Sequence, residues 1–223
     1  MGAGPAAAIA GRCSMSRYPS IGELVLAKPL PPGALDAFSA RPARTLEDYQ
    51  QAMAIRAAVY MAEQDCPYDE EYDGNDFTAT HMVVYSGVRP VGTIRVRWFS
   101  GFAKVERTSI LPAFRGTPAL KVLLAETFEI IARKGYRLAL AQIQARLWPT
   151  WDRVFRCRLV SGRPGFAFSG FDYAEMEIPV ARHPEVLSVR ADPLLVIRPE
   201  GAWDEPGVLD RSAGRPTDGA QAA

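Results

Sequence analysis

A run near the middle of the chain combines charged residues, a proline and a glycine in a pattern that favours anion binding. Residues 106–120 read ERTSILPAFRGTPAL, in which a strand-like segment ends, a loop turns and a strong helical pattern begins at about Ala119. The free N–H groups at the start of a helix, together with the positive end of its dipole, attract anions in the preceding loop. An ordinary connection between a strand and a helix, with Pro118 at the first helical position, gives the same pattern. From spacing alone, both interpretations stay open.

Carboxylates are concentrated in a second place, the loop at residues 65–76. The loop begins like a calcium-binding EF-hand loop, but its twelfth position would be Thr80 instead of the glutamate that such a loop requires, so we do not expect calcium. Asp73 and Asp76 either attract an amine substrate or form a solvated acidic turn. The two histidines and the three cysteines are widely separated, so no metal site is predicted.

The bulk composition excludes several other classes of protein. The chain has 223 residues, of which 48% are hydrophobic, and this is enough for one well-buried core. Basic residues number 26 and acidic residues 25, so the formal charge of +1 provides no long-range attraction to nucleic acid or to an anionic membrane. The first ten residues contain no basic residue, and no apolar run is long enough to span a bilayer. We therefore expect a cytoplasmic protein without nucleic-acid or membrane partners.

Regular elements must position these polar residues, and hydrophobic periodicity predicts such elements between flexible ends. Thr45 and Asp48 have the spacing of a capping box at the start of the first helix. The predicted elements are a strand at 38–43, a helix from Thr45 to about Gln64, strands at 80–86, 91–98 and 104–110, a helix at 119–134, a strand at 137–143, a helical stretch at 151–160 and a strand-like run at 166–180 broken at 169–170. An antiparallel meander followed by a crossover helix and further strands indicates an α+β fold. The predicted organisation is a flexible N-terminal extension (1–36), one domain (37–181) and a partly disordered C-terminal extension (182–223).

The run that follows the third central strand resembles the signature of the GNAT superfamily of N-acyltransferases. In that family, the pattern hydrophobic-Glu-Arg leads through hydrophobic-x-Pro-x-x-Arg-Gly into a helix, and the loop amides hold the pyrophosphate of acetyl-CoA. The residues in register with this signature are Val105, Glu106, Arg107, Ile110, Pro112, Phe114, Arg115 and Gly116. Segments 63–68, 73–76 and 80–82 also resemble a bacterial branch of the family. The resemblance covers residues 38–180 and implies a GNAT-like, acyl-CoA N-acyltransferase fold, in which helices flank a mixed, mostly antiparallel sheet.

The resemblance implies an N-acyltransferase, in the simplest case an N-acetyltransferase, that moves an acyl group from a thioester donor to a small-molecule amine acceptor without a metal. The donor would be acetyl-CoA or another acyl-CoA. The residues expected to bind it are Ile110, Leu111, Arg115, Gly116, Thr117, Ala119 and Leu120. The residues expected to bind the acceptor are Asp73, Asp76 and Arg95.

Direct attack of an amine on a thioester needs a base that removes a proton and donors that stabilise the tetrahedral oxyanion. Glu106 is the predicted base, because a strand glutamate beside the cofactor loop can act directly or through water. A structural salt bridge from Glu106 to Arg95 or Arg97 is the alternative explanation. By resemblance, the oxyanion donor is a backbone N–H near Ile110 or Leu111, where a bulge would splay the sheet.

Three positions depart from the GNAT pattern. Pro118 and Leu120 replace glycines of the loop, which removes one amide donor and adds a bulky side chain near the phosphates. Trp151 stands where the family has a tyrosine that is proposed to protonate the leaving thiolate. These changes favour one alternative, an N-acyl amino acid synthase or acyl-homoserine-lactone synthase that takes its acyl group from acyl carrier protein. A second alternative is a non-catalytic acyl-CoA-binding module, and a homodimer stays open as the assembly.

Overall fold

The structure is a computed structural model, and it describes residues 37–160, 162, 165–168 and 170–213. The predicted N-terminal extension (1–36) and the last part of the C-terminal extension (214–223) lie outside the described residues. In the described part of the chain, no helix has both the length and the apolar composition needed to cross a bilayer.

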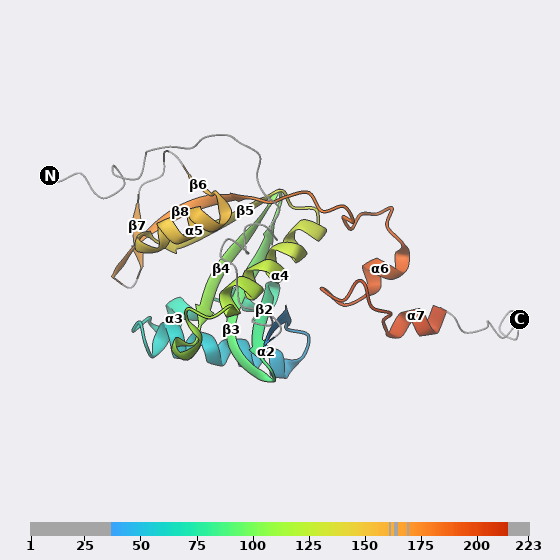
Figure 1. The fold of residues 1–223 in the computed structure, drawn as a ribbon, viewed down its shortest axis with the longest axis horizontal. Helices are drawn as coiled ribbons and strands as arrows, with labels where there is room; N and C mark the ends of the chain where they lie inside the picture. The colour runs from blue at the N-terminus through green and yellow to red at the C-terminus, as the bar shows by residue number, and fades with distance from the viewer. Residues whose placement is uncertain (1–36, 161, 163–164, 169, 214–223) are drawn as a thin grey trace, which may run out of the picture.

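One mixed sheet forms the centre of the fold (Figure 1). Its strands in spatial order are β1 (Phe38–Pro42), β2 (Thr80–Ser86), β3 (Arg89–Phe99), β4 (Phe102–Ile110), β5 (Leu138–Gln144), β8 (Phe171–Pro179) and β6 (Arg158–Leu159), and β7 (Phe166–Phe168) pairs with β8. The neighbouring strands run antiparallel except β4 and β5, which run parallel. The mixed, mostly antiparallel sheet predicted from the sequence is therefore confirmed.

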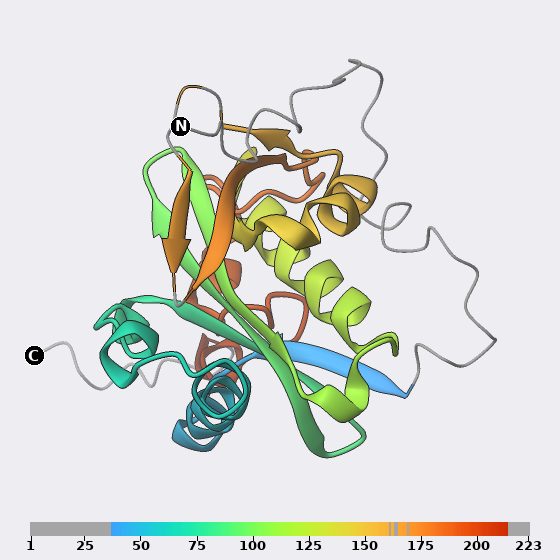
Figure 2. The same cartoon turned by 90° about the vertical axis from the view of Figure 1, so that its left-hand side faces the viewer.

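Helices cover both faces of this sheet. α2 (Leu46–Arg56) lies against one face and α4 (Ala119–Arg133) against the other (Figure 2). The alternation of β2 divides the core between them, because Met82 packs in the cluster under α4 whereas its neighbour Val83 packs under α2. The shorter elements are α3 (Tyr68–Glu71), α5 (Trp148–Phe155), α6 (Pro193–Ile197), α7 (Val208–Ala213) and 3₁₀ turns at Asp76–Thr78, Pro112–Phe114 and Ala145–Leu147.

Local signals mark the start of α2 and the end of α4. Thr45 Oγ1 accepts a hydrogen bond from the N–H of Asp48 at 3.1 Å, and the Asp48 carboxylate accepts one from the N–H of Thr45 at 3.2 Å, which confirms the capping box. Gly135 follows α4 with a φ of +88°, in the left-handed region that glycine adopts without strain. α4 therefore begins and ends close to its predicted limits.

The first helix differs from its predicted range. It is predicted to reach about Gln64, but its α-helical part ends at Arg56 and a π-helical turn, Ala57–Met61, follows. Such a turn contains an extra residue, so it rotates the side chains that come after it relative to the α-helix. In this turn Tyr60 lies against β4 and donates a hydrogen bond from its hydroxyl to the carbonyl of Thr108 at 2.8 Å.

α5 begins and ends earlier than the predicted helical stretch at 151–160. It begins at Trp148, with Pro149 at its N-terminus, where the fixed φ of proline suits a helix start. Arg156 has a φ of +50°, which ends the helix, and Arg158–Leu159 then pairs with β8 as β6. The short strand depends on this long-range pairing, which local periodicity does not report.

Part of the C-terminal extension is packed against the core. The extension predicted at 182–223 contains Trp203, which is only 6% exposed and belongs to the main core cluster. The Arg133 guanidinium lies 5.5 Å from the centre of the Trp203 ring and forms an ion pair with Asp204. These contacts join the segment around Trp203 to the end of α4.

We predict that Trp203→Ala lowers the free energy of unfolding by about 3–5 kcal/mol, because it removes a buried indole and leaves a cavity. Urea denaturation of the full chain measures this change. Val208→Ala in α7 is the control, because Val208 is 71% exposed and its truncation should change the free energy by no more than about 0.5 kcal/mol. Equal stability of Trp203→Ala and the wild type would contradict a structural role for this segment.

Candidate active site

β4 and β5 separate soon after they begin to pair. The parallel ladder between them contains only three residue pairs, from Ala103–Ala139 to Val105–Ala141. Beyond Val105, β4 continues to Ile110, and in this part its ladder partner is β3. The opening predicted beside Ile110 is therefore present.

A bulge in β4 lies at the start of this opening. One residue of β3, Ile94, opposes two residues of β4, Arg107 and Thr108. Arg107 has a φ of +55°, which places it in the left-handed region. The bulge lies earlier in the strand than its predicted position near Ile110 or Leu111. Because a bulge bends its strand and increases the local twist, this one turns β4 away from β5.

The opening forms a cavity of about 360 Å³, which we call the slot. Four of the predicted donor-binding residues line it: Ile110, Arg115, Gly116 and Leu120. Two of the others make hydrogen bonds in or beside the loop. Leu111 donates its N–H to the carbonyl of Val91 at 2.9 Å, and Thr117 donates its hydroxyl to the carbonyl of Phe114 at 2.6 Å. Ala119 is fully buried in the core. Donor binding by these residues stays a prediction.

The backbone of Ile110 faces the slot. Hydrogen bonds along an antiparallel ladder point in alternate directions, and Leu111 points its N–H toward β3, so its neighbour Ile110 turns its N–H and C=O groups away from β3. The Ile110 carbonyl accepts a hydrogen bond from Arg115 Nε at 3.1 Å, which agrees with this orientation. Of the two predicted oxyanion donors, the N–H of Ile110 is available toward the slot, whereas that of Leu111 is occupied.

The start of α4 offers an anion fewer groups than the GNAT pattern implies. Pro118, which has no N–H, is the N-cap residue, one position earlier than predicted, and the N–H of Ala119 is already donated to Thr117 Oγ1 at 3.3 Å. Arg115 carries a positive charge beside the slot, but its guanidinium pairs with the Glu63 carboxylate, with an Nη1–Oε1 distance of 2.7 Å. Leu120 adds an apolar side chain to the slot wall.

A second cavity of about 310 Å³, which we call the side cavity, adjoins the slot. The residues that line both cavities are Tyr60, Gln64, Glu106, Arg107, Gln142 and Tyr173. The side cavity is also lined by Cys66, Glu70, Asp73, Lys104, Phe168 and Phe171. A ligand in the slot and a ligand in the side cavity would therefore meet beside these shared residues, which we call the junction.

Glu106, the predicted base, lies at this junction and is ion-paired. Its Oε1 accepts a hydrogen bond from Arg95 Nε at 3.0 Å, and its Oε2 lies 2.9 Å from Lys104 Nζ. Arg97 is more distant, with its Nε 3.9 Å from Oε1. The salt bridge to Arg95 that formed the alternative explanation is therefore present, and the role of Glu106 as a base stays a prediction.

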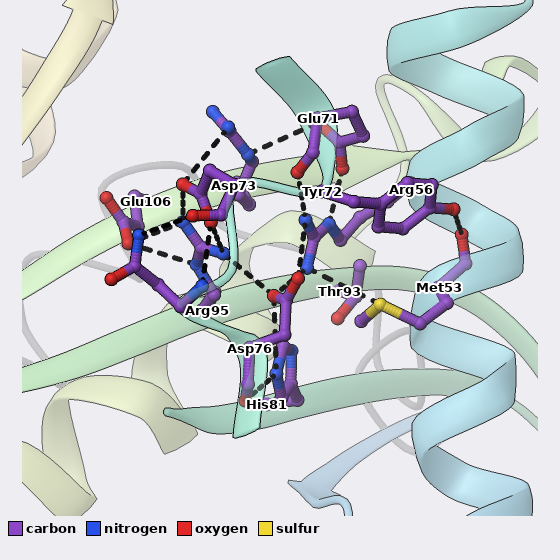
Figure 3. Close-up of polar contacts among 12 residues, drawn as sticks. Met53, Arg56, Glu71, Tyr72, Asp73, Asp76, His81, Thr93, Arg95 and Glu106 are labelled. Atoms are coloured by element: carbon purple, nitrogen blue, oxygen red, sulfur yellow. Dashed lines mark hydrogen bonds and ion pairs between the residues drawn. The ribbon is translucent and has the colours of Figure 1, made fainter. Parts of the chain in front are cut away.

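Behind the side cavity, two fully buried arginines hold the acidic loop against the sheet (Figure 3). Arg95 Nη2 lies 2.7 Å from Asp73 Oδ2, and Arg95 Nη1 lies 2.8 Å from Asp76 Oδ1. Arg56 pairs with the same Asp76 and with the buried Glu71. Of the three predicted acceptor-binding residues, Asp73 lines the side cavity, whereas Arg95 and Asp76 lie behind it in these ion pairs.

The ion pairs keep the two aspartates charged. Burial by itself would raise the pKa of Asp76, but hydrogen bonds from Arg56 and Arg95 outweigh it, so the pKa lies below its usual value. For Asp73, burial also acts to raise the pKa, and hydrogen bonds from Arg95 and from the N–H of Asn75 lower it well below the usual range. Asp73 and Asp76 are therefore held in place by arginines, whereas Asp69 in the same loop is exposed to solvent.

Two tyrosines at the junction escape the sequence analysis as site residues. Tyr60 lies within the range predicted for the first helix, and its hydroxyl donates a hydrogen bond to the carbonyl of Thr108. Burial raises the pKa of Tyr60. Tyr173 lies on β8 opposite Gln144, and its ring stacks on Phe166 with centroids 6.2 Å apart. Its position is set by the pairing of β8 with β5, so nothing near it in the sequence marks it.

Comparison with known proteins supports the predicted resemblance. No family model matches the chain. YjcF, an uncharacterized N-acetyltransferase of Bacillus subtilis (strain 168), is 37% identical over 73 residues, which make up 33% of this chain and 52% of YjcF. A second protein of the same strain, provisionally described as an acetyltransferase, is 35% identical over 92 residues, 40% of this chain and 63% of that protein. The matches thus span between about half and two thirds of the length of these relatives.

Solved structures extend the likeness to the fold. A provisionally described N-acetyltransferase from Lactobacillus plantarum superposes with a TM-score of 0.60 at 18% identity, over 65% of this chain and 99% of that one. An acyl-CoA N-acyltransferase from Pseudomonas aeruginosa gives 0.56 at 18% identity, over 63% and 97%. FeeM, an N-acyl amino acid synthase from uncultured soil microbes, gives 0.55 at 13% identity, over 64% and 90%.

The fold is that of the acyl-CoA N-acyltransferases. The resemblance to the GNAT superfamily predicted from the sequence is confirmed, and the chain is GNAT-like both in its fold and in the matched part of its sequence.

We predict that Asp76→Asn lowers the free energy of unfolding by about 3–5 kcal/mol at neutral pH, because it leaves two buried arginines short of a partner. The wild type should also lose stability on acidification more steeply than the variant does. A carboxylate whose pKa is lower in the folded than in the unfolded state stabilises the protein above its unfolded pKa of about 4, and this contribution is lost as the pH falls through the folded pKa.

Urea denaturation at several pH values between about 7 and about 3 measures both effects. Asp69→Asn removes an exposed carboxylate from the neighbouring α3 and is the matched control, with an expected change of no more than about 0.5 kcal/mol. Parallel pH profiles for the wild type and Asp76→Asn would contradict the predicted contribution of this carboxylate.

Proposed function

We propose that this protein is an N-acyltransferase that moves an acyl group from a thioester donor, acetyl-CoA or another acyl-CoA, to the amine of a small-molecule acceptor. The slot between β4 and β5 carries the proposal. Beyond Val105, none of the described strands pairs with the edge of β4 that faces β5, so backbone groups on this edge, such as the N–H of Ile110, can bind an extended chain. The pantetheine arm of the donor is an extended chain with amide groups, which suits this edge.

The reaction is attack by the acceptor nitrogen on the carbonyl carbon of the thioester. A C–N bond forms, the C–S bond breaks, and the thiolate leaves. The proton of the acceptor nitrogen passes to Glu106, and the thiolate takes a proton from the Tyr173 hydroxyl. The N–H of Ile110 stabilises the oxyanion of the tetrahedral intermediate, because it already points into the slot before the donor binds.

Glu106 can accept a proton although it is ion-paired. A carboxylate offers roughly four lone-pair positions, and Arg95 and Lys104 together make three close contacts with its two oxygens. The two cations therefore fix the orientation of the carboxylate and leave room for one further hydrogen bond. The side chain of Glu106 is 10% exposed, so an amine or a bridging water in the cavities can reach it.

The acceptor enters through the side cavity. Asp73 contributes an anionic edge there and is 28% exposed, so it can attract a protonated amine while it holds Arg95. The rings of Phe168, Phe171 and Tyr173 form an apolar wall opposite these charges. This combination suits an amine attached to an apolar body.

A second candidate differs in the donor. Pro118 at the start of α4 removes an amide donor, and Leu120 narrows the slot near the place where a CoA pyrophosphate would lie. A carrier protein presents its pantetheine arm without that pyrophosphate. These two residues therefore favour an N-acyl amino acid synthase or acyl-homoserine-lactone synthase type of reaction with acyl carrier protein as the donor.

We predict thiol release from a thioester donor in the presence of an amine, measured with a colorimetric thiol reagent over a panel of acyl-CoA and acyl carrier protein donors and amine acceptors. Glu106→Gln should lower kcat/KM by about 100-fold, because the base is lost. Glu47→Gln on the exposed part of α2 is the matched control and should leave turnover unchanged. Thermal denaturation of both variants shows whether they remain folded.

Each result of the panel of donors supports one of the three candidate functions. Turnover with acyl-CoA supports the first proposal, and turnover only with the carrier protein supports the second candidate. Binding of a donor without thiol release across the panel would instead favour the non-catalytic acyl-CoA-binding module.

We predict that Tyr173→Phe lowers kcat by about 10-fold or more with little change in the dissociation constant of the donor, because the variant loses the proton for the thiolate and keeps the ring. Pre-steady-state kinetics and calorimetry measure the two quantities. Tyr68→Phe, which removes a hydroxyl from a residue that is 64% exposed, is the control. An unchanged kcat in Tyr173→Phe would exclude this tyrosine as the acid.

A further inference from the structure

The hydroxyl of Ser109 is a buried polar group to which the proposed reaction gives no role. Ser109 lies on β4 just after the bulge and is only 3% exposed. Its Oγ has no hydrogen-bond partner among the residues that the structure describes. Ser109 lines the slot, but it is not among the residues that line the side cavity. The residue that carries this unsatisfied hydroxyl therefore borders the slot and not the side cavity.

The residue opposite Ser109 shows that a buried hydroxyl in this part of the sheet can find a partner. Its direct partner on β3 is Thr93, which is fully buried as well. Thr93 Oγ1 donates a hydrogen bond to the carbonyl of Met82 at 2.7 Å and is therefore satisfied. A buried hydroxyl without a partner destabilises a protein by about 1–3 kcal/mol. The folded protein bears this cost at Ser109, directly beside the residue whose N–H points into the slot.

We propose that the Ser109 hydroxyl donates a hydrogen bond to a carbonyl oxygen of the bound thioester donor. The inference rests on the proposed function and adds a donor-binding residue to it. Carbonyl oxygens are the acceptors that an acylated pantetheine arm presents, on its amides and on its thioester, and a rotatable hydroxyl can aim at either. With the N–H of Ile110, Ser109 gives the slot two adjacent donors, one from a side chain and one from the backbone.

The test is a pair of opposite changes in Ser109→Ala. Removal of an unsatisfied buried hydroxyl should raise the Tm, by about 2–4 °C for a chain of this size. The same substitution should weaken donor binding by about 3- to 10-fold, since it removes one hydrogen bond. Thr93→Val is the matched control: it removes a satisfied hydroxyl from the partner position and should lower the Tm. Differential scanning calorimetry and isothermal titration calorimetry of the full chain measure both properties.

Titration with CoA and with acetyl-CoA identifies the carbonyl. A loss of affinity for both ligands assigns the hydrogen bond to a pantetheine amide, and a loss for acetyl-CoA alone assigns it to the thioester. If neither ligand binds the wild type, the same titrations are made with an acylated and an unacylated carrier protein.

Two results overturn the inference. One is equal donor affinity of Ser109→Ala and the wild type, and the other is a lower Tm in Ser109→Ala, which would mean that the hydroxyl has a partner within the folded protein. Failure of the wild type to bind any of these donors would overturn the proposed function, and the inference with it. Normal binding by the wild type with an unaffected Ser109→Ala variant overturns the inference alone.

Discussion

The early separation of β4 from β5 is the constraint on which the rest of the site depends. Their ladder holds only as far as Val105, and the bulge at Arg107 then turns β4 away. In a continuous sheet, the N–H of Ile110 would pair with a neighbouring strand and the slot would not exist. The bulge itself is stabilised by contacts with the π turn and with α3, because Tyr60 donates to the carbonyl of Thr108 and the Arg107 guanidinium reaches Glu71 Oε2 at 3.2 Å.

The buried arginines contribute more to the arrangement of the residues around them than to the stability of the fold. Replacing a buried ion pair with well-packed apolar residues is often neutral or stabilising, whereas loss of one partner is costly, so such a pair mainly excludes other arrangements of its residues. Arg95 contacts both the acidic loop and Glu106. One guanidinium thus fixes the wall of the side cavity and the carboxylate at the junction in relation to each other. Arg56 anchors the same loop to α2 through Asp76.

Local signals predict the elements well and the site only in part. The range of α4 and the capping box at Thr45 depend on residues within a few positions, so the sequence predicts them. The resemblance adds the opening beside Ile110. The π turn, the pairing that places Tyr173, the cluster around Trp203 and the unsatisfied hydroxyl of Ser109 arise from contacts between distant segments. No local pattern encodes such contacts, so the sequence analysis misses them.

In the proposed function, the slot and the start of α4 contribute unequally to donor binding. At the pyrophosphate end, Pro118 lacks an N–H and the guanidinium of Arg115 is already paired with Glu63, so a phosphate would have to displace or share that carboxylate. At the arm end, Ile110 offers its backbone without competition from another strand. Binding free energy should therefore come mainly from the arm and its carbonyl groups. A site that binds its donor mainly through the pantetheine arm discriminates weakly between CoA and a carrier protein, because both present the same arm.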